Sequence, residues 1–532
     1  MAKKHGSPVY AGYPFATAFE SHDGKNDLHQ LPWSFQLFKA VDEPQGTYKV
    51  KDIQGKTREG KYVPCHRIIK GGVEQKIVWI REHELQLNRC LEVVLVDIGQ
   101  GDGCLVVTPE GKQMVIDAGE GANMRHYLNW RNGTRKNTSF EAAIITHPDS
   151  DHYQGFAKLF ERANFFFETI YTNGLMEFPE KSDSLRLGPV ESLECQDGVN
   201  RKLVTNLVTS KKELEAFLKG KGKPFRNFPS MLNDAMVGKK EAGSNDEPVT
   251  GQTMGDFKML SAADKYLPGY EKGKPLSIQV LGPVPDIVNK RPMLRWLSSP
   301  SKTKNGHSVV LRFQYGNVSL MLGGDLNVPS EHLLLSHHTG MVSPPKAEDS
   351  EKFVAAARKV FQVDIAKSCH HGSSDFTSWF LMALNPVATV ISSGDDEPHS
   401  HPRSDTLGAI GKYSRCQGEA RPLIFSTELA RSTKDDQQKP WEIRSQIWKQ
   451  VEQLLAAKPE KQQKLKEKLK EKLIKDIDRS VAVYGAITVV TDGTNAIVYQ
   501  KLEQRSSHNE YDIYRFEPTG KDGSLEFVQQ KH

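Results

Sequence analysis

Two histidines and two aspartates stand within the six residues HPDSDH at 147–152, one residue after the apolar run AAII at 142–145. Such a run is typical of a buried strand. Side chains at i and i+2 of an extended segment point to one side, so His147, Asp149 and Asp151 can converge there. His152 follows where the chain is expected to turn into a helix. Charged groups crowded at a strand end are costly unless a cation neutralises and orders them. The spacing therefore predicts a divalent-metal site, in preference to an Asx-turn and helix cap with incidental histidines.

Three later segments have the same sequence pattern, in which an apolar strand ends in residues able to bind a metal. Asp325 follows the Gly-Gly turn in VSLMLGGDLN, and His370 and His371 stand in tandem in DIAKSCHHGSSDF. His399 and His401 follow the strand VATVISSG, in PHSHPRSDTL. Taken singly, each signal is weak, because an Asp or a His at a strand end also serves turns and caps. Taken in this order, the segments match a known layout.

In this order the segments resemble the metallo-β-lactamase superfamily, whose H-x-[HD]-x-D-H pattern stands here as HPDSDH. Asp117 in VIDAG matches the aspartate that supports a ligand from behind, Asp325 the bridging aspartate, and His401 the last metal histidine. The segments VDIGQGDGCLV, HPDSDH, KSCHHGSSDF and HPRSDTL together resemble the ComEC branch, named after the hydrolase domain of a bacterial DNA-uptake protein. This resemblance covers roughly residues 91–425 and 482–503.

The resemblance implies a site that holds two divalent ions, Zn²⁺ or Mn²⁺, and activates water. The implied ligands are His147, Asp149 and His370 for one ion, Asp151, His152 and His401 for the other, and Asp325 between them. Either His370 or His371 can be the ligand that the tandem supplies. Asp149 stands where many members have His, and the additional carboxylate favours Mn²⁺ without excluding Zn²⁺.

Other residues are implied in catalysis and in support of the ligands. Asp151 is expected to orient the nucleophilic hydroxide in addition to binding metal. His371 and Lys367 are expected to hold the phosphate or its departing oxygen. Asp117 is expected to support a ligand from behind, and His307 to shape the pocket beside the ligands.

The strand and helix patterns indicate an α/β protein, and the resemblance implies the αββα sandwich of the superfamily. A small β-rich module is expected at 1–88, where β-like alternation and Gly turns recur. The hydrolase domain is expected at 89–429, with a loop-rich insertion, high in Lys, Gly and Pro, at about 160–300. Two apolar stripes at i, i+4 spacing predict an inserted helical hairpin at 430–480. A final β-hairpin of the hydrolase domain and a polar tail are expected at 481–532.

The composition narrows the class of protein and its location. Charged residues make up 26% of the 532 residues, as in soluble globular proteins. The six cysteines form no C-x-x-C pair, which is typical of free thiols in a reducing compartment. The chain has no signal-peptide pattern at its start and no apolar stretch near the roughly 18 residues of a membrane span. A cytoplasmic protein without membrane contact is therefore expected.

The resemblance implies a metal-dependent hydrolase, most directly a phosphodiesterase or nuclease. The net charge of +5 and the Lys-rich stretches 219–223, 239–240 and 302–304 agree with a phosphate-bearing or nucleic-acid substrate. The alternative is hydrolysis of a lactone, thioester, β-lactam or peptide, because fold and metals do not fix the substrate. A scaffold without activity is disfavoured, since every main ligand position is retained. By analogy alone, a defence-system effector is a further alternative, with a protein partner at the N-terminal module or the helical hairpin.

Overall fold

Buried strands and the helices that cover them make up most of the computed structural model of this chain. It describes residues 5–19, 28–43, 45–51, 57–69, 71–133, 137–161, 164–178, 186–219, 227–238, 252–394, 400–416, 421–427, short segments between 452 and 467, 483–502, 510–519 and 523–528. The α/β class expected from the sequence is confirmed, with helices and four sheets among these residues.

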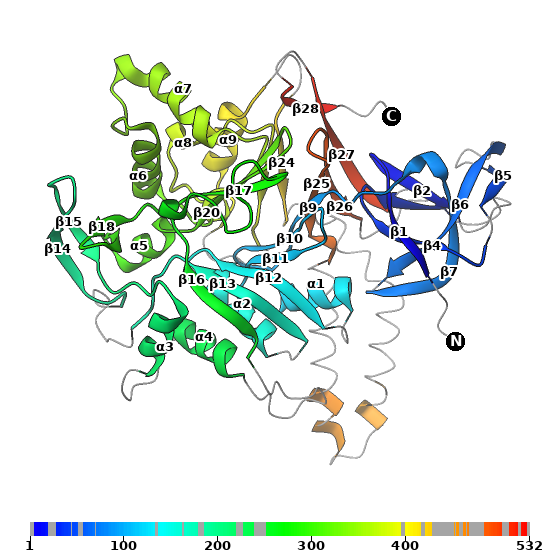
Figure 1. Ribbon diagram of the computed structural model, residues 1–532, viewed down its shortest axis with the longest axis horizontal. Coiled ribbons are helices and arrows are strands. Elements are labelled where there is room, and N and C mark those ends of the chain that lie inside the picture. The colour runs from blue at the N-terminus through cyan, green and yellow to red at the C-terminus, as the bar shows by residue number, and fades with distance from the viewer. Residues whose placement is uncertain are drawn as a thin grey trace.

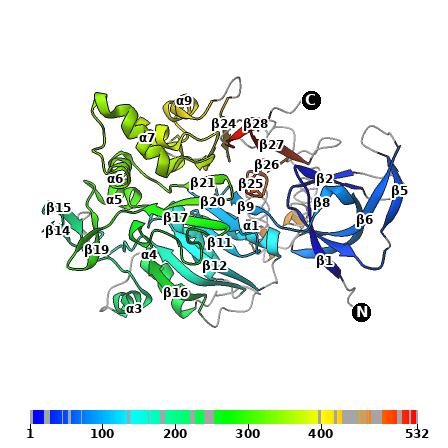
Figure 2. The ribbon, with the colours of Figure 1, turned by 45° about the horizontal axis from the view of Figure 1, so that its top comes forward.

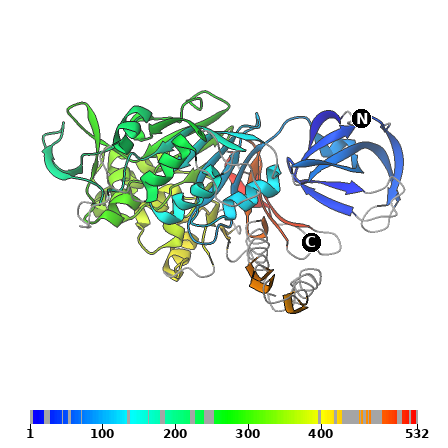
Figure 3. The same cartoon turned by 90° about the horizontal axis from the view of Figure 1, so that it is seen from below.

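The N-terminal strands form a sheet of their own at one end of the molecule (Figure 1). The strands are β1 His5–Ala11, β2 Phe15–Phe19, β3 Leu28–Pro32, β4 Gln36–Ala40, β5 Gly46–Lys51, β6 Thr57–Ile69, β7 Gly72–Arg81 and β8 Leu85–Gln86. Their order is β3-β2-β7-β6-β4-β1-β8, with β5 paired to β6. The sheet curves around a small apolar core of its own. Figure 3 shows the curved sheet from below. Trp33 of this lobe packs against Val490 and Ile497 of the next sheet.

A ten-stranded sheet carries the first half of the site. Its strands are β9 Leu91–Leu95, β10 Gly103–Val107, β11 Gln113–Ala118, β12 Thr138–Ile145, β13 Phe165–Thr172, β16 Met254–Met259, β25 Ile487–Thr491, β26 Ala496–Lys501, β27 Tyr511–Pro518 and β28 Leu525–Val528. The order is β16-β13-β12-β11-β10-β9-β25-β26-β27-β28. From β11 to β16 the neighbours are parallel, whereas the other pairs are antiparallel. The β25–β26 pair is a hairpin inside the range 481–532, where the sequence predicts one, and Asp492 and Gly493 lie between its strands.

A six-stranded sheet carries the second half of the site. Its strands are β17 Leu276–Gly282, β20 Val310–Tyr315, β21 Val318–Leu322, β22 Ile365–Lys367, β23 Ala388–Ile391 and β24 Leu423–Ser426, paired in that order. The strands from β21 to β24 are parallel. A small sheet of β14 Val190–Glu194, β15 Asn200–Val204, β19 Arg291–Arg295 and β18 Asp286–Val288 lies toward the end of the molecule opposite the N-terminal lobe (Figure 2).

The two large sheets face each other across a shared apolar core. Leu95, Ile116 and Ile144 of the first sheet belong to the same buried cluster as Leu311 and Leu320 of the second. The outer face of the first sheet packs against α1 Asn123–Asn132, α2 Ser150–Phe160, α3 Lys211–Lys219 and α4 Asn227–Val237. The outer face of the second packs against α6 Val328–Thr339, α7 Ser350–Phe361 and α8 Ser378–Leu384. Other helices of the described residues are α5 Pro300–Gly306, α9 Ser404–Tyr413 and the short 3₁₀ turns η1 Glu82–Glu84, η3 Ala262–Asp264, η4 Ala347–Asp349 and η5 Cys369–Gly372.

Loops that follow parallel strands emerge at one edge of each sheet, where ligands of open α/β sheets usually bind. The HPDSDH loop follows β12, the Gly-Gly-Asp turn follows β21, and η5 follows β22. Because the sheets face each other, the two sets of loops can meet. This is the structural basis of the site.

Two stretches of the chain differ from, or fall outside, the expected organisation. The described part of the interval 160–300 holds seven strands and the helices α3 and α4, and six of the strands belong to the small sheet or stand at the edge of a large one. The interval is therefore more regular than its Lys, Gly and Pro content indicates. Within it, NFPS at 227–230 opens α4, because a proline is tolerated in the first helical turn. Of the expected hairpin at 430–480, most residues lie outside those described, and so do the lysines at 220–223 and 239–240. In the described part of the chain, no helix combines the length and the apolar character that crossing a membrane requires.

Candidate metal centre

Histidine and aspartate side chains from both sheets meet at the ends of the parallel strands. In the described part of the chain, four groups of three such residues have ligand atoms that all lie within 4.8 Å of one another. The groups are His147, His152 and Asp325; Asp151, His152 and His371; Asp102, Asp325 and His371; and Asp102, Asp117 and His152. Because the groups share members, they form one continuous cluster.

Asp325 lies at the centre of this cluster. Its Oδ2 is 3.2 Å from Nε2 of His152 and 3.3 Å from Nε2 of His371. His371 Nε2 is also 3.5 Å from Oδ2 of Asp151. One carboxylate oxygen therefore lies between two imidazole nitrogens that come from different sheets, as a bridging ligand requires.

The tautomer of His147 is fixed by two hydroxyl groups. Its Nδ1 lies 3.0 Å from Thr146 Oγ1 and 3.2 Å from Ser308 Oγ. Both hydroxyls already donate elsewhere, Thr146 to Asp117 Oδ2 at 2.7 Å and Ser308 to Asn305 O at 2.8 Å. They must therefore accept the Nδ1 proton, which leaves a lone pair on Nε2 of His147.

His152 is held from behind by Asp117. Its Nδ1 is 2.8 Å from Asp117 Oδ2. The Asp117 carboxylate also accepts a hydrogen bond from the Thr146 N–H at 2.8 Å. The backbone of Asp117 has a φ of +54°. A carboxylate behind an imidazole fixes its tautomer and ring orientation and raises its basicity as a ligand.

Asp102 plays the equivalent part for His371. Its Oδ1 is 3.2 Å from His371 Nδ1, which also lies 3.1 Å from Ser392 O. Asp102 Oδ2 accepts a hydrogen bond from the buried ammonium of Lys367, which also donates to Gly324 O at 3.1 Å. The loop that carries Asp102 is pinned under the site, because its N–H donates to Asp151 O at 3.2 Å.

Gly101 makes that close approach feasible. Its φ is +101°, and a Cβ added there would lie 1.7 Å from Asp151 O. Only glycine fits this position. The GQGDG stretch thus brings a carboxylate to the back of the site through backbone contact with the HPDSDH loop.

Four buried polar atoms of the cluster lack a hydrogen-bond partner among the described residues. They are Nε2 of His147, His152 and His371, and Oδ1 of Asp325. Buried polar atoms are nearly always paired in folded proteins. Three imidazole nitrogens and a carboxylate in this state form a donor set that suits divalent metal ions.

The imidazoles of the cluster differ in the direction in which their pKa values are shifted. Burial lowers the pKa of His147 to about 3, and the neighbouring His152 adds to the effect. Burial also opposes charge on His152 and His371, but the surrounding carboxylates outweigh it and hold both pKa values well above the usual range. Against the same opposition from burial, those imidazoles hold the pKa of Asp325 well below its usual value. The carboxylates therefore attract positive charge to the positions where metal ions would supply it.

Asp149 lies beside the cluster and belongs to none of the four groups. Lys304 donates a hydrogen bond to its Oδ1, and its Oδ2 is 3.9 Å from Nε2 of His147. Lys304 is 3% exposed and also donates to Glu177 Oε1 at 3.3 Å. The structure thus gives the Asp149 carboxylate a cationic partner within the protein.

Of the tandem histidines, His371 is a member of the groups and His370 lies at the rim. His370 Nε2 is 3.9 Å from Asp325 Oδ2, and its side chain is 26% exposed. Its ring centroid is 5.7 Å from that of His401, which is 6.3 Å from His371. Both tandem residues have positive φ, +49° and +53°, a rare backbone conformation for such side chains that is often found at functional sites.

Two expected site residues take other partners in this structure. His307 Nε2 lies 2.7 Å from the carbonyl of Arg295, and His307 is in none of the four groups. Lys367, expected to hold a substrate phosphate, is buried and bound to Asp102. In this conformation it supports the cluster from behind. His399 lies outside the described residues.

Three residues of the site escape sequence reasoning. Asp102 stands in a Gly-rich turn, where an aspartate normally only serves the turn. Lys304 stands in a lysine-rich stretch that indicates a solvated surface, yet α5 buries it. Ser308 connects Asp325 N, His147 and Asn305, and a lone serine before a strand carries no signal.

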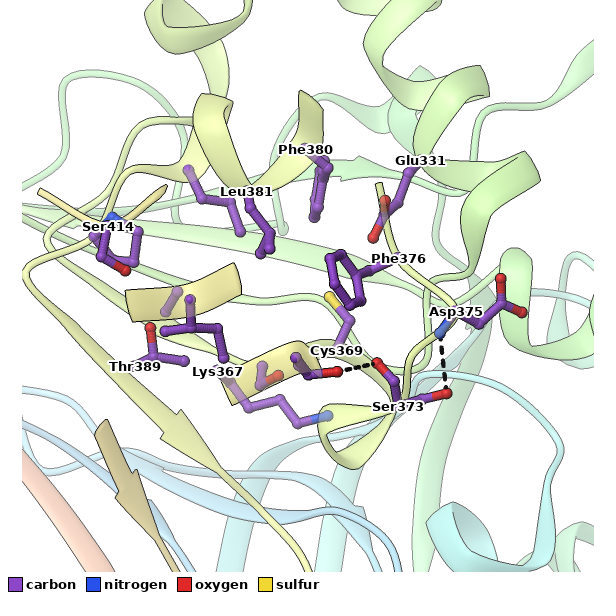
Figure 4. Close-up of a pocket in the computed structure, with 16 residues that line it drawn as sticks. Glu331, Lys367, Cys369, Ser373, Asp375, Phe376, Phe380, Leu381, Thr389 and Ser414 are labelled. Atoms are coloured by element: carbon purple, nitrogen blue, oxygen red, sulfur yellow. Dashed lines mark hydrogen bonds between the residues drawn. The ribbon is translucent and has the colours of Figure 1, made fainter. Parts of the chain in front are cut away.

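A cavity lies next to η5 (Figure 4). Its lining includes Cys369, Phe376, Phe380 and Glu331, and also Lys367, which the cluster shares. Glu331 is buried, and burial raises the pKa of its carboxyl to about 8 although Thr377 N–H bonds to it. The cavity is thus an apolar pocket with a carboxyl that favours its neutral form.

Comparisons with known proteins place few constraints on the chain. No protein-family model and no curated protein matches it. Among solved structures, a mutant of CmlA beta-hydroxylase is similar to it, with 9% sequence identity and a TM-score of 0.29. The match covers 65% of this chain and 54% of that chain. The chain thus spans about half of the length of that protein.

Proposed function

We propose that this protein is a metal-dependent hydrolase of the metallo-β-lactamase type, and that it cleaves phosphodiesters with two divalent ions. The arrangement of sheets and covering helices fits the αββα sandwich of that superfamily. The carrying observation is the set of unpartnered Nε2 atoms of His147, His152 and His371 around Asp325. Each ring is held at Nδ1 by another group, so each is aimed into the cluster.

The net negative charge of the cluster favours binding of two divalent ions together with an anionic substrate. Five carboxylates, Asp102, Asp117, Asp149, Asp151 and Asp325, stand against the two ammonium groups of Lys304 and Lys367. When the imidazoles are neutral, as metal binding requires, three negative charges remain. Two divalent cations would leave a single positive charge, which suits one phosphodiester anion. One divalent cation would leave the site negative and repel such a substrate.

Bound divalent ions lower the pKa of water and polarise a phosphoryl oxygen. The residues of the chain then divide the remaining work. Asp151 is 18% exposed at the mouth of the cluster and can accept a proton from the attacking water. His370 and His401 at the rim are in place to donate hydrogen bonds to the phosphate, the part earlier expected of His371 and Lys367.

The substrate class within phosphodiesters, including nucleic acids, and any protein partner are part of the proposal. Within it, the metals are Zn²⁺ or Mn²⁺, as in the resemblance to ComEC-type hydrolases. All six cysteines are unpaired, and Cys65, Cys90, Cys104 and Cys195 are buried. Free thiols fit a reducing compartment, so we place the activity in the cytoplasm.

The test is hydrolysis by metal-stripped protein to which Mn²⁺, Zn²⁺ or Mg²⁺ is returned separately. Substrates are bis(p-nitrophenyl) phosphate, single- and double-stranded DNA, and RNA. We expect metal-dependent cleavage by wild type and a loss of more than about a hundredfold in Asp151→Ala. Gln154→Ala, an exposed residue of the same helix, should match wild type.

Cleavage that Asp151→Ala retains would reject the assignment of the site. Two bound ions with no cleavage of any phosphodiester would reject the substrate class. It would favour the lactone, thioester, β-lactam or peptide alternative, which is assayed on the same preparations.

A further inference from the structure

Lys304 is the one buried lysine that contacts the HPDSDH loop in the described part of the chain. It projects from α5, whose first turn is capped by the Ser299 hydroxyl. Its ammonium donates to Asp149 Oδ1, to Glu177 Oε1 at 3.3 Å and to Pro148 O at 3.5 Å. All three acceptors surround a nitrogen that is shielded from solvent.

A buried ammonium is costly to desolvate unless its partners are well placed. Glu177 is already paired with Arg186, whose Nη2 lies 2.7 Å from the same Oε1. Charges thus alternate along Arg186, Glu177, Lys304 and Asp149. Since Glu177 has a cation of its own, the charge that Lys304 contributes is directed to Asp149.

Asp149 is held so that one oxygen faces the cluster. Its Oδ1 is turned to Lys304, and its Oδ2 lies 3.9 Å from Nε2 of His147. In the orientation that satisfies both ends of its amide, Asn305 donates to the same Oδ2 at 2.8 Å. A carboxylate oxygen offers two lone pairs, so Oδ2 can still serve an ion that His147 binds.

We propose that Lys304 is a positioning residue that fixes Asp149 as the second ligand on the His147 side of the cluster. This inference rests on the proposed function. Metal-binding carboxylates are commonly hydrogen-bonded through groups behind them, and loss of such a group weakens metal affinity about 10- to 100-fold. Without Lys304, Asp149 can rotate toward solvent, and the ion on the His147 side loses a ligand. The ion on the side of Asp151 and His371 keeps its own.

The experiment measures binding of Mn²⁺ to metal-free protein by calorimetry and by electron paramagnetic resonance of free Mn²⁺, with no reference to activity. We expect Lys304→Met to weaken one of two binding events by at least about tenfold and to leave the other unchanged. Lys304→Arg should recover part of the loss. Lys302→Met is the matched control, because Lys302 is exposed on the same helix.

A second variant protects the test from misfolding. If Lys304→Met does not fold, Lys304→Met combined with Glu177→Gln removes one carboxylate together with the ammonium and keeps the charge balance of the chain. Two binding events of wild-type affinity, or tighter ones, in the folded variant would overturn the inference alone. Failure of the wild type to bind any divalent ion would overturn the proposed function and this inference together.

Discussion

Ser308→Ala removes one oxygen that joins three loops of the site. The Ser308 hydroxyl accepts from Asp325 N at 3.0 Å, donates to Asn305 O at 2.8 Å and lies 3.2 Å from His147 Nδ1. In the alanine variant the buried Asp325 N–H loses its acceptor. Leaving one buried donor unsatisfied costs about 1–3 kcal/mol, and loss of the bond to Asn305 adds about 1 kcal/mol. We therefore expect the free energy of unfolding to fall by about 2–4 kcal/mol.

The effect on metal binding should be smaller than full loss of a ligand. Thr146 Oγ1, at 3.0 Å, still accepts the His147 Nδ1 proton, so Nε2 keeps its lone pair. What changes is the position of Asp325, whose backbone is no longer tied to Ser308. Metal affinity should therefore fall by about tenfold, the lower end of the range for residues behind a metal ligand.

Urea unfolding in the presence of a chelator measures the first effect, and calorimetric titration with Mn²⁺ measures the second. Ser301→Ala is the control, since Ser301 is exposed on α5 and its loss should stay within about 0.5 kcal/mol of wild type. If Ser308→Ala matched Ser301→Ala in both measurements, the hydroxyl would not hold the site together, and the argument that Ser308 positions Asp325 through its backbone N–H would fail.

Three further predictions concern other groups of the site and its surroundings. Asp102→Asn should lower the free energy of unfolding by about 3 kcal/mol, because it leaves the buried Lys367 ammonium without its carboxylate. Urea unfolding of chelator-treated protein measures this loss, and an unchanged unfolding midpoint would refute it. The Glu331 carboxyl keeps its proton up to about pH 8 in the folded state, but loses it above about pH 4.5 in the unfolded state. The stability that the protonated carboxyl contributes is therefore full at low pH. Between about pH 4.5 and pH 8, the free energy of unfolding declines by about 1.4 kcal/mol per pH unit. Glu331→Gln should remove that decline in urea unfolding curves, and an unaltered pH dependence would contradict the buried neutral carboxyl. Returning Mn²⁺ to stripped wild type at about a hundred times Kd should stabilise it by about 2.7 kcal/mol, a gain that His152→Ala should largely lose in thermal unfolding.

Sequence reasoning reaches the parts of the site that are local in the chain. His147, Asp151 and His152 come together because a strand end and the following helix turn place them there, and this follows from spacing alone. Asp325 and His371 join them because parallel strands of two facing sheets end at one edge. The ligand assignments themselves remain predictions, which the metal measurements above address.

The remaining parts depend on contacts that no local pattern encodes. Asp102 reaches His371 only because Gly101 lets two backbones touch. Lys304 is buried because α5 turns it toward Asp149, although its sequence neighbours favour a surface position. The interval 160–300 contributes strands to sheet edges, where short segments form regular structure by pairing and not by their own propensity.

Anomalous diffraction from crystals grown with Mn²⁺ tests the central claim most directly. Data on either side of the manganese edge locate the ions without reference to any substrate. The account predicts two peaks flanking Asp325 Oδ2, one contacted by Nε2 of His147 and the other by Nε2 of His371. No peak in the cluster, or a single peak remote from Asp325, would contradict it.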